Sequence, residues 1–413
     1  MDYHYAVSFK CLKCEKTFPL KNDFYICPEC GSNVEIIYDY NKIKEVLNKK
    51  NLKENKVFDI FRYKDIYPFS FSINKYNKLK IGGTELYKSD RLGDIIGYKN
   101  FYIKDDTKNP SGSFKDRASI IALIYAMESN KKVVVGASTG NAASSLAALS
   151  ASLGMKNIIF IPKSAPIAKV AQLLIFGANI IMVDGNYDDA FELSLKATEE
   201  FKLYNRNTGY NPFTREGKKS VSFEIIEQLD FNIPDYIFVP MGDGNIISGV
   251  WKGFKDAYKI GLIDKLPVLI GVQSENSSAI VDAFNENRDI VKVTATTIAD
   301  SISVDFPRDG YAALKSLKES NGIGIKISDK KILEAQSILA KYRGIFAEPA
   351  GATSFAGLIY SIEKNLIDKN KVSVILVTGN GLKDINSVIK NINMPPIFSP
   401  LESKWKDKIN EII

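Results

Sequence analysis

Histidine is almost absent from this chain of 413 residues, and the only one, His4, lies beside the N-terminus. Because imidazole is the most common general acid and base in enzymes, an enzyme with this sequence must use lysine, carboxylate, hydroxyl or a cofactor instead. Long apolar runs are also missing, since no stretch reaches the about 18 apolar residues that predict a membrane span. The first residues lack the basic start and apolar core of a secretory signal. We therefore expect a cytoplasmic protein with no membrane partner.

Clusters of basic residues are missing as well. The formal net charge is +7, but the lysines are scattered along the chain, so the sequence does not predict a nucleic-acid groove. The contents of 45% hydrophobic and 25% charged residues are ordinary for a globular protein and are sufficient for a sizeable core. The length predicts one large or two medium domains.

Cysteine is missing after residue 30. The four cysteines form two C-x2-C pairs separated by twelve residues, Cys11 with Cys14 and Cys27 with Cys30. Two knuckles of this spacing can place four thiolates around one tetrahedral zinc ion, so residues 1–40 are predicted to form a zinc ribbon. Such a closed site would be structural. The alternatives are two disulfides or four free thiols, and a reducing cytosol argues against the disulfides.

Short apolar runs alternate with helix-like segments from about residue 84 onward. Gly, Pro or Asn bounds each run, which is the pattern of buried parallel strands joined by crossover helices. In open sheets of this kind, ligands bind at the carboxyl ends of the strands. The clearest runs are residues 133–135, 158–161, 180–183, 236–239, 268–272 and 374–377.

Three turns after these strands, and one lysine segment, are candidates for chemistry. Residues 136–145 open a helix of small residues, where exposed N–H groups favour an anion. Residues 240–249 offer backbone amides around two glycines that can hold a phosphate, and residues 377–384 offer a hydroxyl at a strand end. In residues 104–118, Ser113 and Asp116 have capping-box spacing, which places Lys115 in the first turn of a helix. Taken singly, these features also fit a tight connection, a strand cap and a surface lysine.

Together, the four segments resemble those of the fold-type II pyridoxal-phosphate enzymes, and among these most closely the threonine synthases. The resemblance covers about residues 80–390 and extends to the N-terminal ribbon, which also occurs among threonine synthases. The strings that carry it are Asn109-Pro110-Ser111-Gly112-Ser113-Phe114-Lys115-Asp116-Arg117, Ser138-Thr139-Gly140-Asn141, Glu348-Pro349-Ala350-Gly351-Ala352 and Thr378-Gly379-Asn380-Gly381-Leu382-Lys383-Asp384.

The resemblance implies an α/β fold with two domains, each an open twisted sheet flanked by helices, in addition to the ribbon. Residues 41–125 and 208–413 would form the large cofactor-binding domain, and residues 126–207 the small one. It also implies a homodimer that acts on a small-molecule amino-acid substrate.

Individual residues gain roles from the same resemblance. Lys115 would hold pyridoxal 5'-phosphate as a Schiff base and shuttle protons. Asn141 would hydrogen-bond the cofactor's 3-hydroxyl, and Thr378 would meet its pyridine nitrogen. Ser138 and Thr139 would bind the substrate carboxylate. The cofactor's phosphate would be bound by the backbone amides of Gly242, Asp243, Gly244, Asn245 and Ile246.

One segment departs from the threonine synthase pattern. Threonine synthases carry an arginine between an Asn-Pro pair and a Glu-Gly pair, but that position is Thr214 here, and Arg215 follows it. A shift of one residue on a helix rotates a side chain by about 100°. Arg215 is nevertheless our first choice for the group that binds a substrate phosphate, ahead of Lys218, Lys219 and Arg308.

The implied activity is that of a carbon–oxygen lyase acting on phosphates, in threonine biosynthesis. It would convert O-phospho-L-homoserine and water to L-threonine and phosphate. The alternatives are a serine or threonine dehydratase, a cysteate synthase or a diaminopropionate-type lyase. A binding module with a degenerate catalytic domain would lack the cofactor chemistry altogether.

Overall fold

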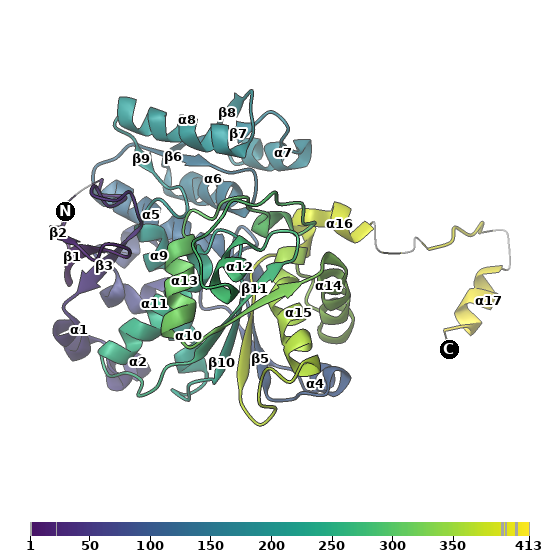
Figure 1. The fold of residues 1–413 in the computed structure, drawn as a ribbon. Helices are drawn as coiled ribbons and strands as arrows, with labels where there is room; N and C mark the ends of the chain where they lie inside the picture. Colours follow the sequence, from purple (N-terminus) through teal and green to yellow (C-terminus); the bar gives the residue numbers. More distant parts are fainter. Residues whose placement is uncertain (1, 22, 390–391, 393–394, 401–403, 413) are drawn as a thin grey trace.

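The computed structural model describes residues 2–21, 23–389, 392, 395–400 and 404–412, and it contains three sheets (Figure 1). An antiparallel sheet near the N-terminus has the order β2-β1-β3. A four-stranded parallel sheet has the order β8-β7-β6-β9, and a six-stranded sheet has the order β12-β11-β10-β13-β5-β4. In the six-stranded sheet only β4 runs antiparallel to its neighbour.

The strand bounds are β1 Ala6–Cys11, β2 Thr17–Phe18, β3 Val34–Tyr38, β4 Leu86–Lys88, β5 Phe101–Asp105, β6 Val133–Ala137, β7 Lys156–Pro162, β8 Asn179–Val183, β9 Tyr204–Asn205, β10 Tyr236–Pro240, β11 Val268–Ser274, β12 Ile323–Ile327 and β13 Ser373–Val377. The α-helices are α1 Tyr40–Val46, α2 Lys49–Glu54, α3 Ile73–Tyr76, α4 Asp90–Ile96, α5 Lys115–Glu128, α6 Asn141–Leu153, α7 Ile167–Ile175, α8 Tyr187–Glu200, α9 Phe213–Lys218, α10 Ser220–Gln228, α11 Asn245–Lys259, α12 Ala279–Asn285, α13 Gly310–Glu319, α14 Asp329–Arg343, α15 Pro349–Glu363, α16 Ile385–Ile389 and α17 Lys404–Asn410. Short 3-10 helices are η1 Ile60–Ile66, η2 Asp106–Lys108, η3 Asp300–Ile302 and η4 Gly381–Asp384.

Each of the six apolar runs forms a strand, and all six strands pair in parallel, as the sequence predicted. Every residue of β13 is buried, because helices cover both faces of a parallel sheet. The cluster that includes Val272, Phe355 and Ile375 joins α15 to this sheet. Figure 1 shows the four-stranded sheet and its helices above the six-stranded sheet, with the N-terminal strands to one side.

This topology brings together the ends of two strands that the sequence predicted to lie at ligand sites. β6 and β10 are in different sheets, and each is followed at once by a helix, α6 or α11. The turns between them, predicted from the sequence as ligand sites, therefore face the space between the two sheets. None of the helices that the structure describes combines the length and apolarity needed to cross a membrane.

Candidate active site

A cavity of about 380 Å³ lies where the turns after β6 and β10 meet. Most of the predicted site residues line it, together with residues 300–306 and 308 from the loop before α13 and residues 186–188 at the start of α8. The predicted site residues that line it are Lys115, Ser138, Thr139, Asn141, Gly242, Asp243, Gly244, Asn245 and Ile246.

Lys115 is the first residue of α5 and lies partly buried at the cavity wall. Burial, together with the charge of the nearby Arg206 guanidinium, lowers the pKa of Lys115 to about 8. The predicted capping box is wrong: the N-cap is Phe114, and the buried Ser113 hydroxyl has no hydrogen-bond partner among the residues that the structure describes. Asp116 instead accepts hydrogen bonds from the backbone N–H and the hydroxyl of Ser111, at 2.7 and 2.5 Å, which closes the turn before the lysine.

The turn after β6 places small polar groups at the first turn of α6. Asn141 begins this helix, and Ser138 and Thr139 precede it. The Asn141 side chain donates to Glu348 Oε1 at 2.7 Å and to Ser301 Oγ at 3.1 Å. The free N–H groups of a helix start attract anions, so this end of the cavity suits a carboxylate.

The turn after β10 brings backbone close to the cavity because it contains glycine. Gly244 has a φ of +89°, and a Cβ there would lie 2.8 Å from the Asp309 carbonyl oxygen. A Cβ on Gly242 would lie 2.8 Å from the Ile302 Cα. Side chains are therefore excluded at both positions, and the turn packs closely against the loop before α13. The backbone N–H groups at the start of α11 lie at the cavity wall, where they suit a phosphate. Burial raises the pKa of the Asp243 carboxyl in this turn to about 6.

Among the four basic candidates for a substrate phosphate, Lys218 and Arg308 line the cavity, whereas Arg215 and Lys219 do not. The Arg215 guanidinium is buried in an ion pair with Asp309 and also donates to the Val34 carbonyl oxygen at 2.8 Å. Its side chain is thus turned away from the cavity toward β3 and α13.

Lys219 is likewise occupied, in ion pairs of 2.6 Å with Glu216 and 2.9 Å with Asp256. The one-residue shift seen in the sequence therefore rotates Arg215 into a structural contact.

Thr378 is buried at the end of β13 but is not part of the cavity wall. Its carbonyl oxygen accepts a hydrogen bond of 2.9 Å from the N–H of Phe114, the residue before Lys115. The structure thus connects Thr378 to the lysine turn through the backbone, and its predicted contact with the pyridine nitrogen stays a prediction.

Sequence reasoning missed several residues at the cavity. Tyr187 and Asp188 line it from the start of α8, and Thr208 lines it beside the buried Arg206. A signal for the first two was present, because Asn186 and Asp189 form a capping box directly after β8. Glu348 belongs to a quoted motif but was given no role, although burial raises its pKa and Asn141 is bound to it.

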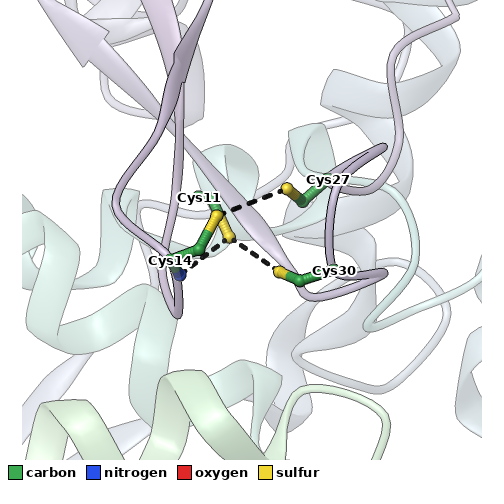
Figure 2. Close-up of side chains that lie close together, drawn as sticks. All are labelled: Cys11, Cys14, Cys27 and Cys30. Carbon is green, nitrogen blue, oxygen red and sulfur yellow. Dashed lines mark hydrogen bonds between the residues drawn. The ribbon is translucent and has the colours of Figure 1, made fainter.

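The four cysteines meet at one point outside the cavity. Figure 2 shows their side chains turned toward one another, and their sulfur atoms all lie within 4.8 Å of one another. The Cys11–Cys30 and Cys14–Cys27 sulfur distances are 3.5 and 3.7 Å, so none of the four forms a disulfide. Four sulfur atoms at these separations can surround a tetrahedral metal ion.

Comparison with known proteins agrees with this geometry. The family model described as "Pyridoxal-phosphate dependent enzyme" matches residues 78–379. The chain is 39% identical to the threonine synthase of Methanocaldococcus jannaschii over 94% of its own length and 95% of the relative's. It is 35% identical to the threonine synthase of Mycobacterium bovis, over 78% of this chain and 86% of that one.

Solved structures share the fold at lower identity. The processed form of threonine deaminase isoform 2 from Solanum lycopersicum aligns with a TM-score of 0.62 at 24% identity, over 74% of this chain and 86% of that one. A fungal L-serine ammonia-lyase from Rhizomucor miehei aligns with a TM-score of 0.65 at 19% identity, over 75% and 98%. The sequence matches combine 35–39% identity with coverage of most of both chains, and they show that this chain belongs to the threonine synthase family of pyridoxal-phosphate-dependent enzymes.

Proposed function

We propose that this chain converts O-phospho-L-homoserine and water to L-threonine and phosphate, using pyridoxal phosphate on Lys115. The observation that carries the proposal is the cavity itself. It brings together a lysine of lowered pKa, a helix start suited to a carboxylate and a glycine turn suited to a phosphate. Membership of the threonine synthase family supports the choice of substrate.

The residues present fit pyridoxal phosphate. The amine of Lys115 has no hydrogen-bond partner among the described residues, so it is free to react with an aldehyde. The turn from Gly242 to Ile246 lines the cavity at the start of α11 and would hold the phosphate with its backbone N–H groups. Asn141 would bond the 3-hydroxyl, and Thr378 would lie toward the pyridine nitrogen.

When bound, the cofactor would stabilise negative charge on the carbon atoms of the substrate that lose protons. Lys115 would move the protons. With a pKa of about 8, it keeps about a tenth of its amine neutral at pH 7, about two hundredfold more than an ordinary lysine of pKa about 10.4. A neutral amine can accept the proton from the substrate Cα and return it, as ammonium, at another carbon.

Residues of the α6 turn would orient the substrate. Ser138 and Thr139, with the N–H groups at the start of α6, would bind the α-carboxylate. This contact fixes one end of the substrate while the phosphate leaves from Cγ and water adds at Cβ.

For the substrate phosphate we propose Arg308 in place of Arg215. Arg308 lines the cavity, stacks 4.7 Å over the Phe191 ring and lies 3.2 Å from Asp188. Its Nε–H group is buried and has no partner in the described part of the chain. A phosphate dianion would accept from this donor, whereas Arg215 is committed to Asp309.

A substrate panel tests the function. The purified chain, loaded with pyridoxal phosphate, should release phosphate and threonine from O-phosphohomoserine and should leave serine and threonine largely unchanged. Deamination of serine or threonine, with no turnover of O-phosphohomoserine, would favour a dehydratase instead. Borohydride reduction should fix the cofactor to Lys115, and labelling of Lys104 or Lys383 would contradict the assignment.

The remaining features belong to the same proposal. Zn²⁺ bound by Cys11, Cys14, Cys27 and Cys30 would stabilise the N-terminal ribbon, and the cluster of four sulfur atoms supports this. We further propose that the enzyme is a cytoplasmic homodimer, which light scattering of the purified protein would test. The domain boundaries at residues 40, 125 and 207 are also proposals.

A further inference from the structure

The described part of the chain contains seven buried lysine and arginine side chains, and two of them differ from the other five. The five form ion pairs with carboxylates. Arg206 and Lys218 have no carboxylate within ion-pairing distance, and both lie close enough to Lys115 to interact with a charge there. The paired five are Lys104, Arg117, Arg215, Lys219 and Lys252.

Lys218 is fully buried at the end of α9 and lines the cavity. Its ammonium donates to Asn245 Oδ1 at 2.5 Å. The Asn245 amide is fixed in this orientation, because its nitrogen donates to Asp309 Oδ2 at 2.7 Å. Asp309 in turn is paired with Arg215. An ammonium has three N–H donors, so two of those on Lys218 have no partner among the described residues.

The Lys218 ammonium lies beside the glycine turn. Asn245, which holds the ammonium, is the first residue of α11 and lines the cavity with Gly242 and Gly244. Helix α9 packs directly on α11, since a Cβ on Gly249 would lie 2.7 Å from Lys218 Cβ. The backbone is therefore arranged so that a lysine side chain reaches the start of α11, where the N–H groups already favour an anion.

We propose that Lys218 is a positioning residue that forms an ion pair with the phosphate of pyridoxal phosphate. This inference rests on the proposed function for the identity of the cofactor. A buried cation without a counterion is costly, and a phosphate dianion in the glycine turn would offset that cost. The cofactor phosphate is favoured over the substrate phosphate because the Lys218 side chain is bonded to Asn245 at the glycine turn, whereas the Arg308 side chain extends to Asp188 on α8.

Cofactor analogues test the proposal, because pyridoxal has the same aldehyde and ring but no phosphate. The Lys218→Met variant should bind pyridoxal phosphate about 10- to 100-fold more weakly than the wild-type apoprotein, as measured by absorbance titration. Its affinity for pyridoxal should change by less than about threefold, because only the phosphate contact is lost. An equal loss for both ligands would overturn the proposal, since Lys218 would then act on Lys115 or on the fold.

The stability of the apoprotein distinguishes a lysine that binds the cofactor from one that only supports the fold. Without cofactor, Lys218→Met should melt at the same temperature as wild type or higher, because the variant removes an uncompensated buried charge. The matched control is the neighbouring Lys219→Met, which leaves Glu216 and Asp256 without their cation and should melt lower. A large loss of apoprotein stability in Lys218→Met would contradict the proposal.

Kinetic measurements test the alternative that Lys218 binds the phosphate of the substrate and not that of the cofactor. If Lys218→Met binds both cofactor forms normally but has a raised KM for O-phosphohomoserine and weaker inhibition by inorganic phosphate, Lys218 binds the substrate phosphate and the proposal is overturned. If the wild-type protein does not bind pyridoxal phosphate at all, the proposed function itself fails.

Discussion

The side-chain amide of Asn33 donates hydrogen bonds to the backbone oxygens of Gly209, at 2.5 Å, and Arg308, at 3.1 Å. Asn33 follows the last cysteine knuckle, whereas Arg308 lines the cavity and Gly209 follows the cavity residue Thr208. A single side chain thus connects the four-cysteine segment to both loops. Because a Cβ on Gly209 would lie 2.8 Å from Arg308 Cβ, these loops are also packed tightly on each other.

This connection predicts a kinetic effect at a distance. Asn33→Ala should raise the KM for O-phosphohomoserine by several-fold, about the effect of losing one ordinary hydrogen bond of about 1 kcal/mol, because Arg308 would be held less firmly. The affinity for pyridoxal phosphate should not change. Asn232→Ala is a suitable control, since that side chain bonds only to neighbouring backbone. An unchanged KM would show that the two loops hold Arg308 without Asn33.

Metal removal tests the cysteine cluster. Elemental analysis should find one zinc ion per chain, and the Cys14→Ser variant should lose it. Chelation should increase proteolysis of residues 1–40 much more than that of the large sheets, since a structural zinc ion stabilises its own module. Lys13→Ala should keep the metal. A metal-free native protein with two disulfides would contradict the assignment.

The pH dependence of cofactor attachment follows from the pKa of Lys115, which is lowered to about 8. Only the neutral amine attacks an aldehyde, so the rate should rise about tenfold per pH unit below 8 and then level off. The measurement is the rate of covalent attachment of pyridoxal to the apoprotein from pH 6 to 10. A rate that keeps rising to pH 10 would show that the amine has an ordinary pKa.

Two arginine variants distinguish Arg215, chosen from the sequence, from Arg308, chosen from the structure, as the residue that binds the substrate phosphate. Arg308→Ala should raise the KM for O-phosphohomoserine about tenfold or more and weaken inhibition by inorganic phosphate, while the cofactor spectrum stays intact. Arg215→Ala should act mainly on stability, by about 3–5 kcal/mol, because Asp309 would be left as a buried unpaired charge. If Arg215→Ala instead raises the KM in a stable protein, the sequence-based choice was right.

The sequence predicted the parts of this molecule that depend on local pattern. Apolar runs predicted the central strands, and the glycine turns after β6 and β10 predicted nearly half of the residues that line the cavity. The runs missed β5, because Lys104 and Asp105 interrupt its apolar pattern although both are buried. Lys104 is tolerated there through a 2.7 Å ion pair with Glu224, a residue far away in the sequence.

Contacts between distant segments explain the other failures. The direction of the Arg215 side chain depends on Asp309, and the position of the Lys218 ammonium depends on Asn245. No local pattern in a single sequence reveals such partners.

Isotope labelling during turnover tests the central claim most directly. O-phosphohomoserine is incubated with the holoenzyme in water enriched in ¹⁸O, and both products are analysed by mass spectrometry. The account predicts that the label enters the threonine hydroxyl and not the phosphate, because water adds at Cβ while the bond between Cγ and oxygen breaks. Labelled phosphate with homoserine as the second product, or formation of 2-oxobutyrate and ammonia, would contradict it.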